Sequence, residues 1–368
     1  MKVPFNDLKR VATFEAAPLQ AAATRVINSG WFVMGPEVQH FEAEFAHATG
    51  GSHSCVSVAN GSDALGIGLQ ALGVGPGDLV ATAANAAMYS TLAILSLGAI
   101  PVFVDSNSEH TLSLEHFRMV SAAGTLKAVV VTHLYGRLAD IEPIVELART
   151  LDIAVLEDCA QAHFAKLGQR MAGTFGDVGT FSFYPTKNLG ALGDAGALLC
   201  ANSDLDQRAR ALRQYGWKTK YSVETAGGRN SRLDEMQAAF LRVRLPRLGA
   251  STQRRMEIAQ RYSLGIRHPW VRTPKPAGDE FVAHLYVVAC PKRYALKAYL
   301  AECGIGSEVH YPSPDHRQLI IAKRYADVFL PNTERAAAEV LSLPCFPELM
   351  DAEVDYVIHS INAWPHES

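Results

Sequence analysis

The chain has 368 residues, of which 48% are apolar and 19% are charged, and its formal net charge is −3. A chain of this length predicts one large domain together with a smaller one. The charge balance excludes the basic face or tail that nucleic-acid binding requires, and the opening segment MKVPFNDLKR lacks the apolar core and cleavage signal of a secretory peptide.

Residues 79–104 form a stretch that is apolar enough to raise the question of a membrane span. Asn85 and Pro101 interrupt it, as do three hydroxyl-bearing residues at 89–91. These interruptions favour a buried strand, a helix and a second strand over one spanning helix. We therefore expect no contact with a membrane.

The six cysteines are scattered, with no CxxC pair and no clustered histidines beside them. This spacing argues against a disulfide framework and against a structural zinc site. We expect buried thiols in a reducing compartment, and hence a cytoplasmic protein without a metal ion. The residues concerned are Cys55, Cys159, Cys200, Cys290, Cys303 and Cys345.

From about residue 37, short β-rich runs alternate with segments of helix length. This alternation predicts an α/β domain with a mostly parallel sheet. The expected strands are 54–58, 79–82, 101–104, 128–132, 154–157, 179–183 and 196–200. Helices between them are indicated at 62–65, 141–151 and 204–212.

A long helical stretch begins at Leu233 and runs through MQAAFLRVRLPRL into STQRRMEIAQRY. Pro246 and Gly249 interrupt it, and strand and helix patterns resume from Phe281 after a Pro-punctuated region. The interruption predicts a domain boundary near 246–250. We expect a large domain with an N-terminal arm at 1–247 and a smaller C-terminal α+β domain at 248–368.

The segment FSFYPTKNLG, residues 181–190, ends a predicted strand at a Pro-containing turn with Lys187 just beyond it. Downstream, Gly190, Gly193 and Gly196 let the chain turn back into the next strand. A lysine at a strand end that faces a cleft can lose its proton through desolvation and then attack an aldehyde. The alternative is an ordinary surface lysine in a loop.

Two other predicted strand ends carry groups that could act with this lysine. An apolar run leads into Asp158, at the edge where α/β sheets bind their ligands. This carboxylate could pair with a protonated pyridine nitrogen, or it could cap the following helix. Gly61 and Ser62 follow the first strand, and such a turn can cradle a phosphate, although it is common in α/β proteins.

A phosphate cradle, an acid and a lysine on successive strand ends form the arrangement of fold-type I pyridoxal-phosphate enzymes. The motifs that carry a closer resemblance are NGSDAL, THLYG, EDCAQAH, FSFYPTKNLGALGDAGAL and GGRNSRLDEMQAA. They closely resemble the DegT/StrS-type family of nucleotide-sugar aminotransferases, from VPFNDL near the N-terminus to EVHYPSPDHRQ and LSLPCFP near the C-terminus. The resemblance implies fold type I of the aspartate aminotransferase superfamily, with a mostly parallel seven-stranded sheet in the large domain.

The resemblance also implies how pyridoxal 5′-phosphate is held. Lys187 would form a Schiff base with it and later move a proton between the substrate carbon and the cofactor. Asp158 would keep the pyridine nitrogen protonated, and Gln161 would contact the phenolic oxygen. The groups expected on the phosphate are Gly61, Ser62 and Ser182.

Asn230 matches an asparagine that in the family reaches the phosphate bound by the neighbouring subunit. The resemblance therefore implies a homodimer with shared active sites, whereas the residues alone also fit a helix-capping turn before LDEMQAAFL. His310, Tyr311 and His284 match positions near the substrate, although such side chains are ordinarily structural or exposed. The other substrate candidates are Tyr184 and two cations that could contact substrate phosphates or be plain surface charges, Lys220 and Arg232.

The chain departs from the family pattern at one position. Most members carry an aromatic residue that stacks on the cofactor ring, and the matching position here is Ala87 in the run ANAAMY. We expect Met88 or Tyr89 to pack on the ring instead, or the ring face to be more open than usual.

The implied reaction is transamination with L-glutamate as amino donor and pyridoxamine 5′-phosphate as the intermediate form of the cofactor. The acceptor is expected to be a dTDP-linked 3-keto-6-deoxyhexose, aminated at C3, because NGSDAL and the segment from Gln214 to NSRLDE resemble the C3 branch. The alternatives are a C4 aminotransferase for a dTDP-, UDP- or GDP-4-keto sugar and a regulatory protein that binds the cofactor without transaminating. Some relatives bind the same cofactor but dehydrate their substrate, and they carry a histidine in place of this lysine. The presence of Lys187 therefore argues against a dehydratase.

Overall fold

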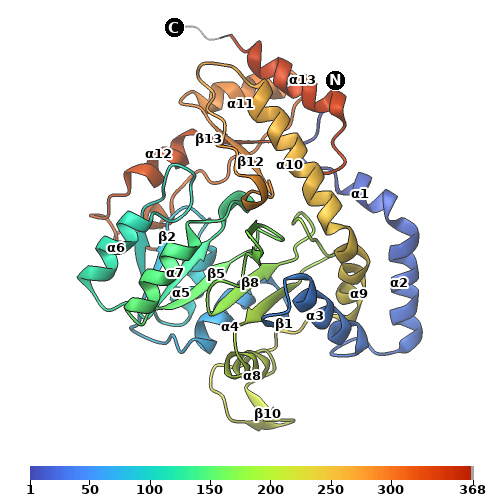
Figure 1. Cartoon of the computed structure of the whole chain (residues 1–368), viewed down its shortest axis with the longest axis vertical. Helices are drawn as coiled ribbons and strands as arrows, with labels where there is room; N and C mark the ends of the chain where they lie inside the picture. The colour runs from blue at the N-terminus through green and yellow to red at the C-terminus, as the bar shows by residue number, and fades with distance from the viewer. Residues whose placement is uncertain (366–368) are drawn as a thin grey trace.

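A seven-stranded sheet lies at the centre of the computed structural model, which describes residues 1–365 (Figure 1). The strand order is β1-β9-β8-β5-β4-β2-β3, and only β9 within this sheet runs against its neighbours. The predicted, mostly parallel sheet is thereby confirmed. Its strands are β1 (Ser54–Val58), β2 (Leu79–Ala83), β3 (Ile100–Val104), β4 (Ala128–Thr132), β5 (Ala154–Asp158), β8 (Val178–Ser182) and β9 (Gly196–Cys200).

Helices cover both faces of the sheet because successive strand side chains point to opposite sides. In β4, Val129 and Val131 belong to the apolar cluster under α6 and α7, whereas Val130 belongs to the cluster under α4 and α5. One face carries α4 (Gly61–Ala71), α5 (Tyr89–Ser96) and α8 (Ser203–Leu212). The other carries α3 (Pro36–Ala48), α6 (Leu114–Ala123), α7 (Ile141–Thr150) and α9 (Glu235–Arg244).

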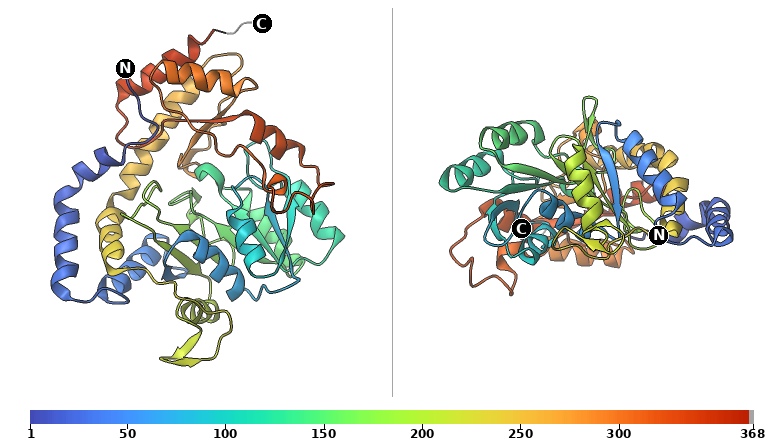
Figure 2. Two further views of the ribbon diagram at one scale, coloured as in Figure 1. Left: turned by 180° about the vertical axis from the view of Figure 1, so that it is seen from behind. Right: turned by 90° about the horizontal axis from the view of Figure 1, so that it is seen from below.

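The N-terminal and C-terminal segments pack beside this layered core (Figure 2). Helix α1 (Leu8–Phe14) leads into α2 (Ala16–Ser29), which lies against α9. The C-terminal part contains a two-stranded antiparallel sheet of β12 (Tyr286–Ala289) and β13 (Val340–Leu343). Its helices are α10 (Leu248–Gly265), α11 (Arg293–Glu302), α12 (Pro331–Glu339) and α13 (Asp351–Asn362).

Short elements complete the chain. Two hairpins are formed by β6 (Lys166–Leu167) with β7 (Arg170–Met171) and by β10 (Trp217–Thr219) with β11 (Ser222–Val223). The 3₁₀ turns are η1 (Leu134–Gly136), η2 (Leu245–Arg247), η3 (Gly278–Glu280) and η4 (Asp315–Arg317).

The helical stretch that begins near residue 233 is divided as its sequence suggests. Helix α9 ends at Arg244, Pro246 lies in the turn η2, and α10 begins at Leu248. Figure 1 shows the two helices running on from one another beside the sheet. The division into domains at 247/248 stays a prediction.

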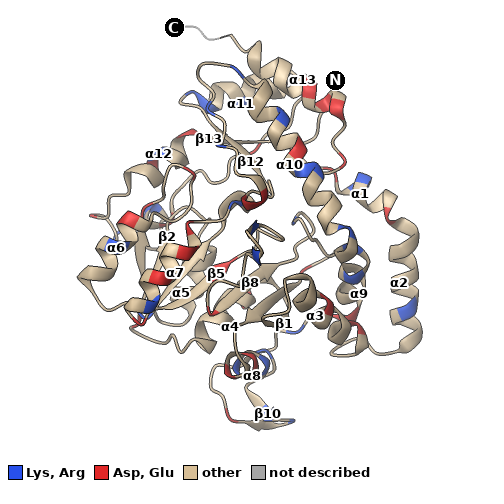
Figure 3. Ribbon diagram, in the orientation of Figure 1, with Lys and Arg blue, Asp and Glu red and all other residues tan. Residues whose placement is uncertain are grey.

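The apolar segment 79–104 folds as β2, α5 and β3. Among the described residues, no helix is both long enough and apolar enough to cross a membrane. Basic residues (Lys and Arg) and acidic residues (Asp and Glu) are interspersed along the helices in the view of Figure 3. All six cysteines are free thiols, and Cys303 alone among them is partly exposed.

A buried carboxylate joins α9 to the start of α3. Glu235, which is 1% exposed, accepts hydrogen bonds from the backbone N–H groups of Gly35 (2.8 Å), Glu37 (2.8 Å) and Val38 (2.9 Å). These N–H groups lie at the N-terminus of α3, where no intrahelical acceptor is available and no local side chain caps the helix. Glu235 thus acts as a cap supplied from a distant part of the chain.

We expect Glu235→Gln to lower the free energy of unfolding by about 3 kcal/mol, because an amide supplies fewer acceptors and no charge to three buried donors. Urea denaturation followed by circular dichroism measures the loss. The matched control is Glu44→Gln, which removes an exposed pair with Arg242 and should cost about 1 kcal/mol or less. Equal losses for the two variants would contradict the capping role.

Candidate active site

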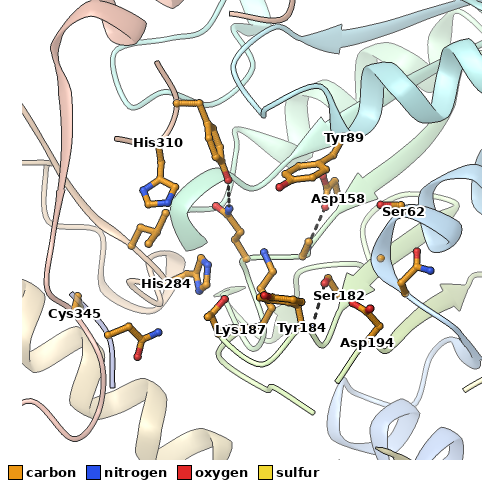
Figure 4. Close-up of a pocket in the computed structure, with 18 of the residues that line it drawn as sticks. Ser62, Tyr89, Asp158, Ser182, Tyr184, Lys187, Asp194, His284, His310 and Cys345 are labelled. Carbon is orange, nitrogen blue, oxygen red and sulfur yellow. Dashed lines mark hydrogen bonds between the residues drawn. The ribbon is translucent and has the colours of Figure 1, made fainter. Parts of the chain in front are cut away.

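A cavity of about 480 Å³ opens at the carboxyl ends of β1, β5 and β8, between the sheet and the C-terminal part of the chain (Figure 4). Because β1, β5 and β8 run in the same direction, the polar residues that follow their carboxyl ends lie at the same edge of the sheet. The predicted residues that line it are Gly61, Ser62, Tyr89, Asp158, Gln161, Ser182, Tyr184, Lys187, His284, His310 and Tyr311.

Four predicted residues do not line this cavity in their own chain. Met88 is buried in an apolar cluster with Phe103 and the segment around Tyr325. Asn230 is exposed and pairs with Gln214, beyond the end of α8. Lys220 is exposed in the β10–β11 hairpin, and Arg232 is half-buried beside Tyr215.

The N-terminus of α4 forms a concave anion cradle. The Asn60 side chain caps the helix by accepting from the N–H of Asp63 at 2.8 Å. The N–H groups of Gly61 and Ser62 have no acceptor among residues 1–365, because the first turn of a helix has no preceding carbonyl for them. A Cβ on Gly61 would lie 2.6 Å from Cβ of Ser182. Glycine therefore allows the Ser182 hydroxyl to approach the helix start, as a phosphate site requires.

Asp158 lies at the end of β5 and is 5% exposed. Its carboxylate accepts from the N–H of Ala160 at 3.1 Å and from the Thr132 hydroxyl at 3.5 Å. Burial raises the pKa of Asp158, while these hydrogen bonds and Lys187 oppose the rise. The carboxylate retains acceptor capacity toward the cavity, which suits a cationic N–H partner.

Gln161 is fixed in one orientation by its neighbours. Its Oε1 accepts from the N–H of Tyr135 at 2.6 Å, so Nε2 is the donor, and Nε2 donates to the Tyr311 hydroxyl at 3.2 Å. An amide nitrogen carries two hydrogens. The second one is available to an oxygen in the cavity.

Lys187 points into the cavity with its amine between the Asp158 side and His284 (Figure 4). Burial lowers the pKa of Lys187 to about 8, although the nearby Asp158 raises it. A substantial fraction of this amine is therefore neutral and nucleophilic near neutral pH.

Burial keeps two histidines of the cavity wall, His284 and His310, neutral. His284 Nδ1 lies 3.0 Å from Oδ1 of Asn188, whose Nδ2 donates to the carbonyl of Val282, so His284 carries its proton on Nδ1 and leaves Nε2 as an acceptor. Burial first, then the Lys187 charge, lowers the pKa of His284 far below its usual value. Burial likewise lowers the pKa of His310 to about 4.

The segment before α5 brings Tyr89, and not Met88, to the cavity. Ala87 and Met88 both have left-handed φ angles, 53° and 66°, which reverse the chain just before the helix. Asp315 holds this turn, because its carboxylate accepts from the Met88 N–H at 2.9 Å and from the Thr91 hydroxyl at 2.6 Å. Tyr89 then stands above the Asp158 side of the cavity (Figure 4).

Several lining residues were not predicted from the sequence. The N-terminal arm supplies Phe5 and Asn6, and it is held in place by hydrogen bonds between Val3 and the backbone of residues 304–306. Phe5 stacks on His310, with ring centroids 5.8 Å apart. The remaining unpredicted residues on the wall are Asn60, Leu65, Ala160, Thr186, Asp194, Arg255, Leu285, Leu343 and Cys345.

A second group of side chains could in principle hold a metal ion, but its donor atoms are already engaged. Glu157 accepts from the N–H groups of Gly173, Phe175 and Gly176 and pairs with His133 Nε2 at 2.9 Å. His133 Nδ1 accepts from a backbone N–H as well. Together with Cys159 these groups form a hydrogen-bonded core network beneath the cavity.

The cavity residues fit a pyridine-based aldehyde cofactor that carries a phosphate. The chain offers a helix-start cradle that a Cβ on Gly61 would fill, a buried acceptor on Asp158, a donor on Gln161 and an amine with a lowered pKa on Lys187. These are the groups that a phosphate, a protonated ring nitrogen, a phenolic oxygen and an aldehyde respectively require.

The structure is similar to that of Streptomyces venezuelae DesV, solved in complex with a ketimine intermediate. The TM-score is 0.94 at 40% sequence identity, covering 99% of this chain and 98% of the other. The fold is that of the PLP-dependent aminotransferases, as the sequence predicted.

The chain belongs to the DegT/DnrJ/EryC1/StrS aminotransferase family, whose sequence model matches residues 15–362. One relative is the dTDP-3-amino-3,4,6-trideoxy-alpha-D-glucose transaminase of Streptomyces venezuelae, 40% identical over 99% of this chain and 96% of the relative. Another is the "pleiotropic regulatory protein" of Geobacillus stearothermophilus, 39% identical over 98% of each chain. The predicted family is confirmed, and this family is PLP-dependent.

The lowered pKa of Lys187 predicts an unusual pH profile for its chemical reactivity. In the cofactor-free protein, reductive methylation of Lys187 should rise with pH to a midpoint near 8, because deprotonation through that value releases the neutral amine. Relative to an ordinary lysine, about 300-fold more amine is neutral at pH 7. Peptide mass spectrometry with limiting formaldehyde measures the profile, with exposed Lys218 as internal reference.

Asp158→Asn should move this midpoint to lower pH, because it removes the neighbouring charge that raises the pKa of Lys187. A midpoint near that of exposed lysines in the unmodified chain would refute the buried, partly neutral amine. An unchanged midpoint in Asp158→Asn would refute the electrostatic coupling between the two residues.

Proposed function

We propose that this protein transfers the amino group of L-glutamate to C3 of a dTDP-linked 3-keto-6-deoxyhexose. The observation that carries the proposal is the joint burial of Lys187 and Asp158 in a cavity whose far end is a helix-start anion cradle. The named sugar transaminase relative and the family membership supply the class of substrate.

When bound, pyridoxal 5′-phosphate stores the amino group between two half-reactions and withdraws electrons from the substrate carbon. Lys187 holds the cofactor covalently at rest. Once the amino group of a substrate displaces it from the cofactor, the freed Lys187 amine would take up the proton of the substrate carbon on Nζ and pass it on, and it would act in the reverse direction with the second substrate. His284, which lines the same cavity, stays neutral and therefore adds no second positive charge there.

The surrounding residues orient the cofactor for this chemistry. Gly61, Ser62 and Ser182 bind the phosphate at the start of α4, and Asp158 keeps the ring nitrogen protonated, which preserves the electron sink. Gln161 donates its free amide hydrogen to the phenolic oxygen.

Tyr89 would cover the face of the cofactor ring that Ala87 leaves open. Its side chain lines the cavity and is 51% exposed in the single chain, whereas Met88 packs elsewhere. On the sugar side, Tyr184, His310 and Tyr311 line the cavity and offer hydroxyl and imidazole groups to sugar hydroxyls.

Two observations support C3 over C4 as the carbon that is aminated. The sequence of the cradle, and of the segment leading to NSRLDE, resembles the C3 branch. The chain is also 40% identical to relatives named for dTDP-3-amino sugars from Streptomyces venezuelae and Aneurinibacillus thermoaerophilus. The alternative is amination at C4 of a 4-keto sugar.

The test uses the protein loaded with pyridoxal 5′-phosphate. Addition of L-glutamate should bleach the visible absorption of the bound cofactor, and a dTDP-3-keto-6-deoxyhexose, but not its 4-keto isomer, should restore it. Lys187→Ala should lack the visible band, and its rate should fall by at least about a thousandfold. Mass spectrometry of the nucleotide sugar identifies the aminated product.

Recovery with the 4-keto sugar alone would overturn the C3 assignment. A visible band that responds to no amino donor would favour a regulatory role, for which the name of the Geobacillus stearothermophilus relative is the supporting observation. In that case the cavity would bind the cofactor without turning over.

We further propose that two copies of the chain share their active sites. Asn230 is exposed and lies outside the cavity of its own chain, although it matches an asparagine that the family places at the phosphate of the neighbouring subunit. Lys220, a candidate cation for the substrate phosphates, is also exposed and outside this cavity. Exposed apolar side chains, including Trp31 and Phe32 near α3 and Tyr221 and Val223 in the β10–β11 hairpin, supply surface for an interface. In such a dimer Asn230 completes the phosphate cradle of the partner.

A mixed dimer tests this arrangement. Lys187→Ala and Asn230→Ala chains should each be inactive at limiting cofactor, whereas mixing them by co-expression should restore about a quarter of wild-type activity. The reason is that each heterodimer contains one site with both residues intact. No recovery on mixing would show that Asn230 acts within its own chain or not at all.

A further inference from the structure

Arg255 is a buried cation in the cavity wall without a carboxylate partner. It lies on α10, is 5% exposed, and forms no ion pair among residues 1–365. Burial lowers the pKa of its guanidinium. By contrast, the equally buried Arg213 pairs with Glu42 at 2.6 Å. Arginine is seldom buried unless it is paired, because an uncompensated charge loses its hydration.

The hydrogen bonds of Arg255 leave one edge of its guanidinium unused. Nη1 donates to the carbonyl oxygens of His284 at 3.3 Å and Cys345 at 2.5 Å. Nε and Nη2 meet no oxygen acceptor within the described chain, and neither is a fully enclosed atom. This Nε–Nη2 edge presents two parallel N–H groups, the geometry that binds a carboxylate with two hydrogen bonds.

The charge of Glu348 partly offsets the effect of burial on the pKa of Arg255, but no neighbouring carboxylate forms an ion pair with Arg255 among the described residues. Burial raises the pKa of the Cys345 thiol to about 11, so it is neutral at pH 7. Glu348 lines the small adjoining cavity with Arg255, but no ion pair joins them, and burial raises the pKa of Glu348. Glu15, on the same wall, is already paired with Arg244 at 2.8 Å.

Arg255 also belongs to the immediate surroundings of Lys187. Both residues line the main cavity and the small adjoining one. Burial first, then the charges of Lys187 and Arg255, lowers the pKa of His163 and His284, two buried imidazoles in this region. Arg255 therefore adds a positive charge to the wall of the cavity that contains Lys187, and this wall is suited to an anion.

We infer that Arg255 binds the α-carboxylate of the amino-acid donor, an inference that rests on the proposed function. In an amino acid the carboxylate is bonded to the carbon that carries the reacting nitrogen, so it must lie close to Lys187. The diphosphate of a nucleotide sugar is separated from the C3 carbonyl by part of the sugar ring. An anion site adjacent to Lys187 therefore fits the donor and not the diphosphate.

The two substrates then use one cavity in turn, with different contacts. The donor binds to Arg255 through its carboxylate, and the keto sugar, which has no carboxylate, binds through its hydroxyl groups and its nucleotide. Arg255 consequently contributes to the first half-reaction and not to the second.

The experiment compares Arg255→Lys and Arg255→Gln with wild type, each loaded with cofactor. Arg254→Gln is the matched control, because this neighbour on the same helix pairs with Asp351 at 2.7 Å and does not line the cavity. In single-turnover titrations, the L-glutamate concentration for half-maximal bleaching should rise at least about tenfold in both Arg255 variants. It should stay within about twofold for Arg254→Gln.

Two readouts separate donor binding from a general defect. The reverse half-reaction with the amino sugar product should change less than about threefold in Arg255→Lys, because that substrate lacks a carboxylate. Maleate, a dicarboxylate without an amino group, should raise the thermal midpoint of wild type and of Arg254→Gln but not of the Arg255 variants.

A further comparison needs no variant. Wild-type protein should use 4-aminobutyrate, which lacks the α-carboxylate, at least about tenfold less efficiently than L-glutamate. Equal use of the two amines would overturn the inference, as would unchanged glutamate titrations in folded Arg255 variants. If wild type itself fails to respond to L-glutamate and other amino donors, the proposed function fails instead.

Discussion

The shared burial of an amine and a carboxylate, Lys187 and Asp158, is the constraint on which the rest of the structure depends. Each group would be fully ionised in water, and removal from water shifts both toward their neutral forms. Such a pair persists only where the surrounding chain excludes solvent. The sheet edge supplies one wall, and residues beside β12 and in β13, among them Leu285 and Leu343, supply the other. The C-terminal part of the chain thus controls the protonation of a lysine that the sheet positions.

Charge around this pair is distributed unevenly along the cavity. The start of α4, where we propose that the phosphate binds, offers backbone N–H groups, which bring no net charge. Elsewhere the wall contains Arg255 and imidazoles kept neutral by burial, of which His284 has its tautomer fixed by Asn188. Under the two proposals above, the cavity would accept negative charge at both places, and Asp158 would bind a cationic N–H group.

The sequence predicted the sheet because its strands are short apolar runs bounded by turn residues, and it predicted Lys187 and Asp158 because both follow such runs. Other features depend on distant contacts. Arg254 and Arg255 are adjacent residues of the same type, and the sequence does not distinguish them. Arg254 forms an ion pair at the surface, whereas Arg255 lines the cavity. Tyr89 and not Met88 reaches the cavity because Ala87 and Met88 have left-handed backbone conformations. Residue type does not predict this conformation for residues other than glycine.

The N-terminal arm gives the cavity an unusual assembly order. Phe5 and Asn6 form part of its wall only when Val3 pairs with Ile305 across a separation of about 300 residues, the kind of non-local contact that forms late in folding. Gly306 leaves no room for a side chain there, since its Cβ would lie 2.6 Å from the backbone nitrogen of Phe5. The arm therefore cannot complete this wall until residue 305 has been synthesised, although the strands of the sheet all lie before residue 201.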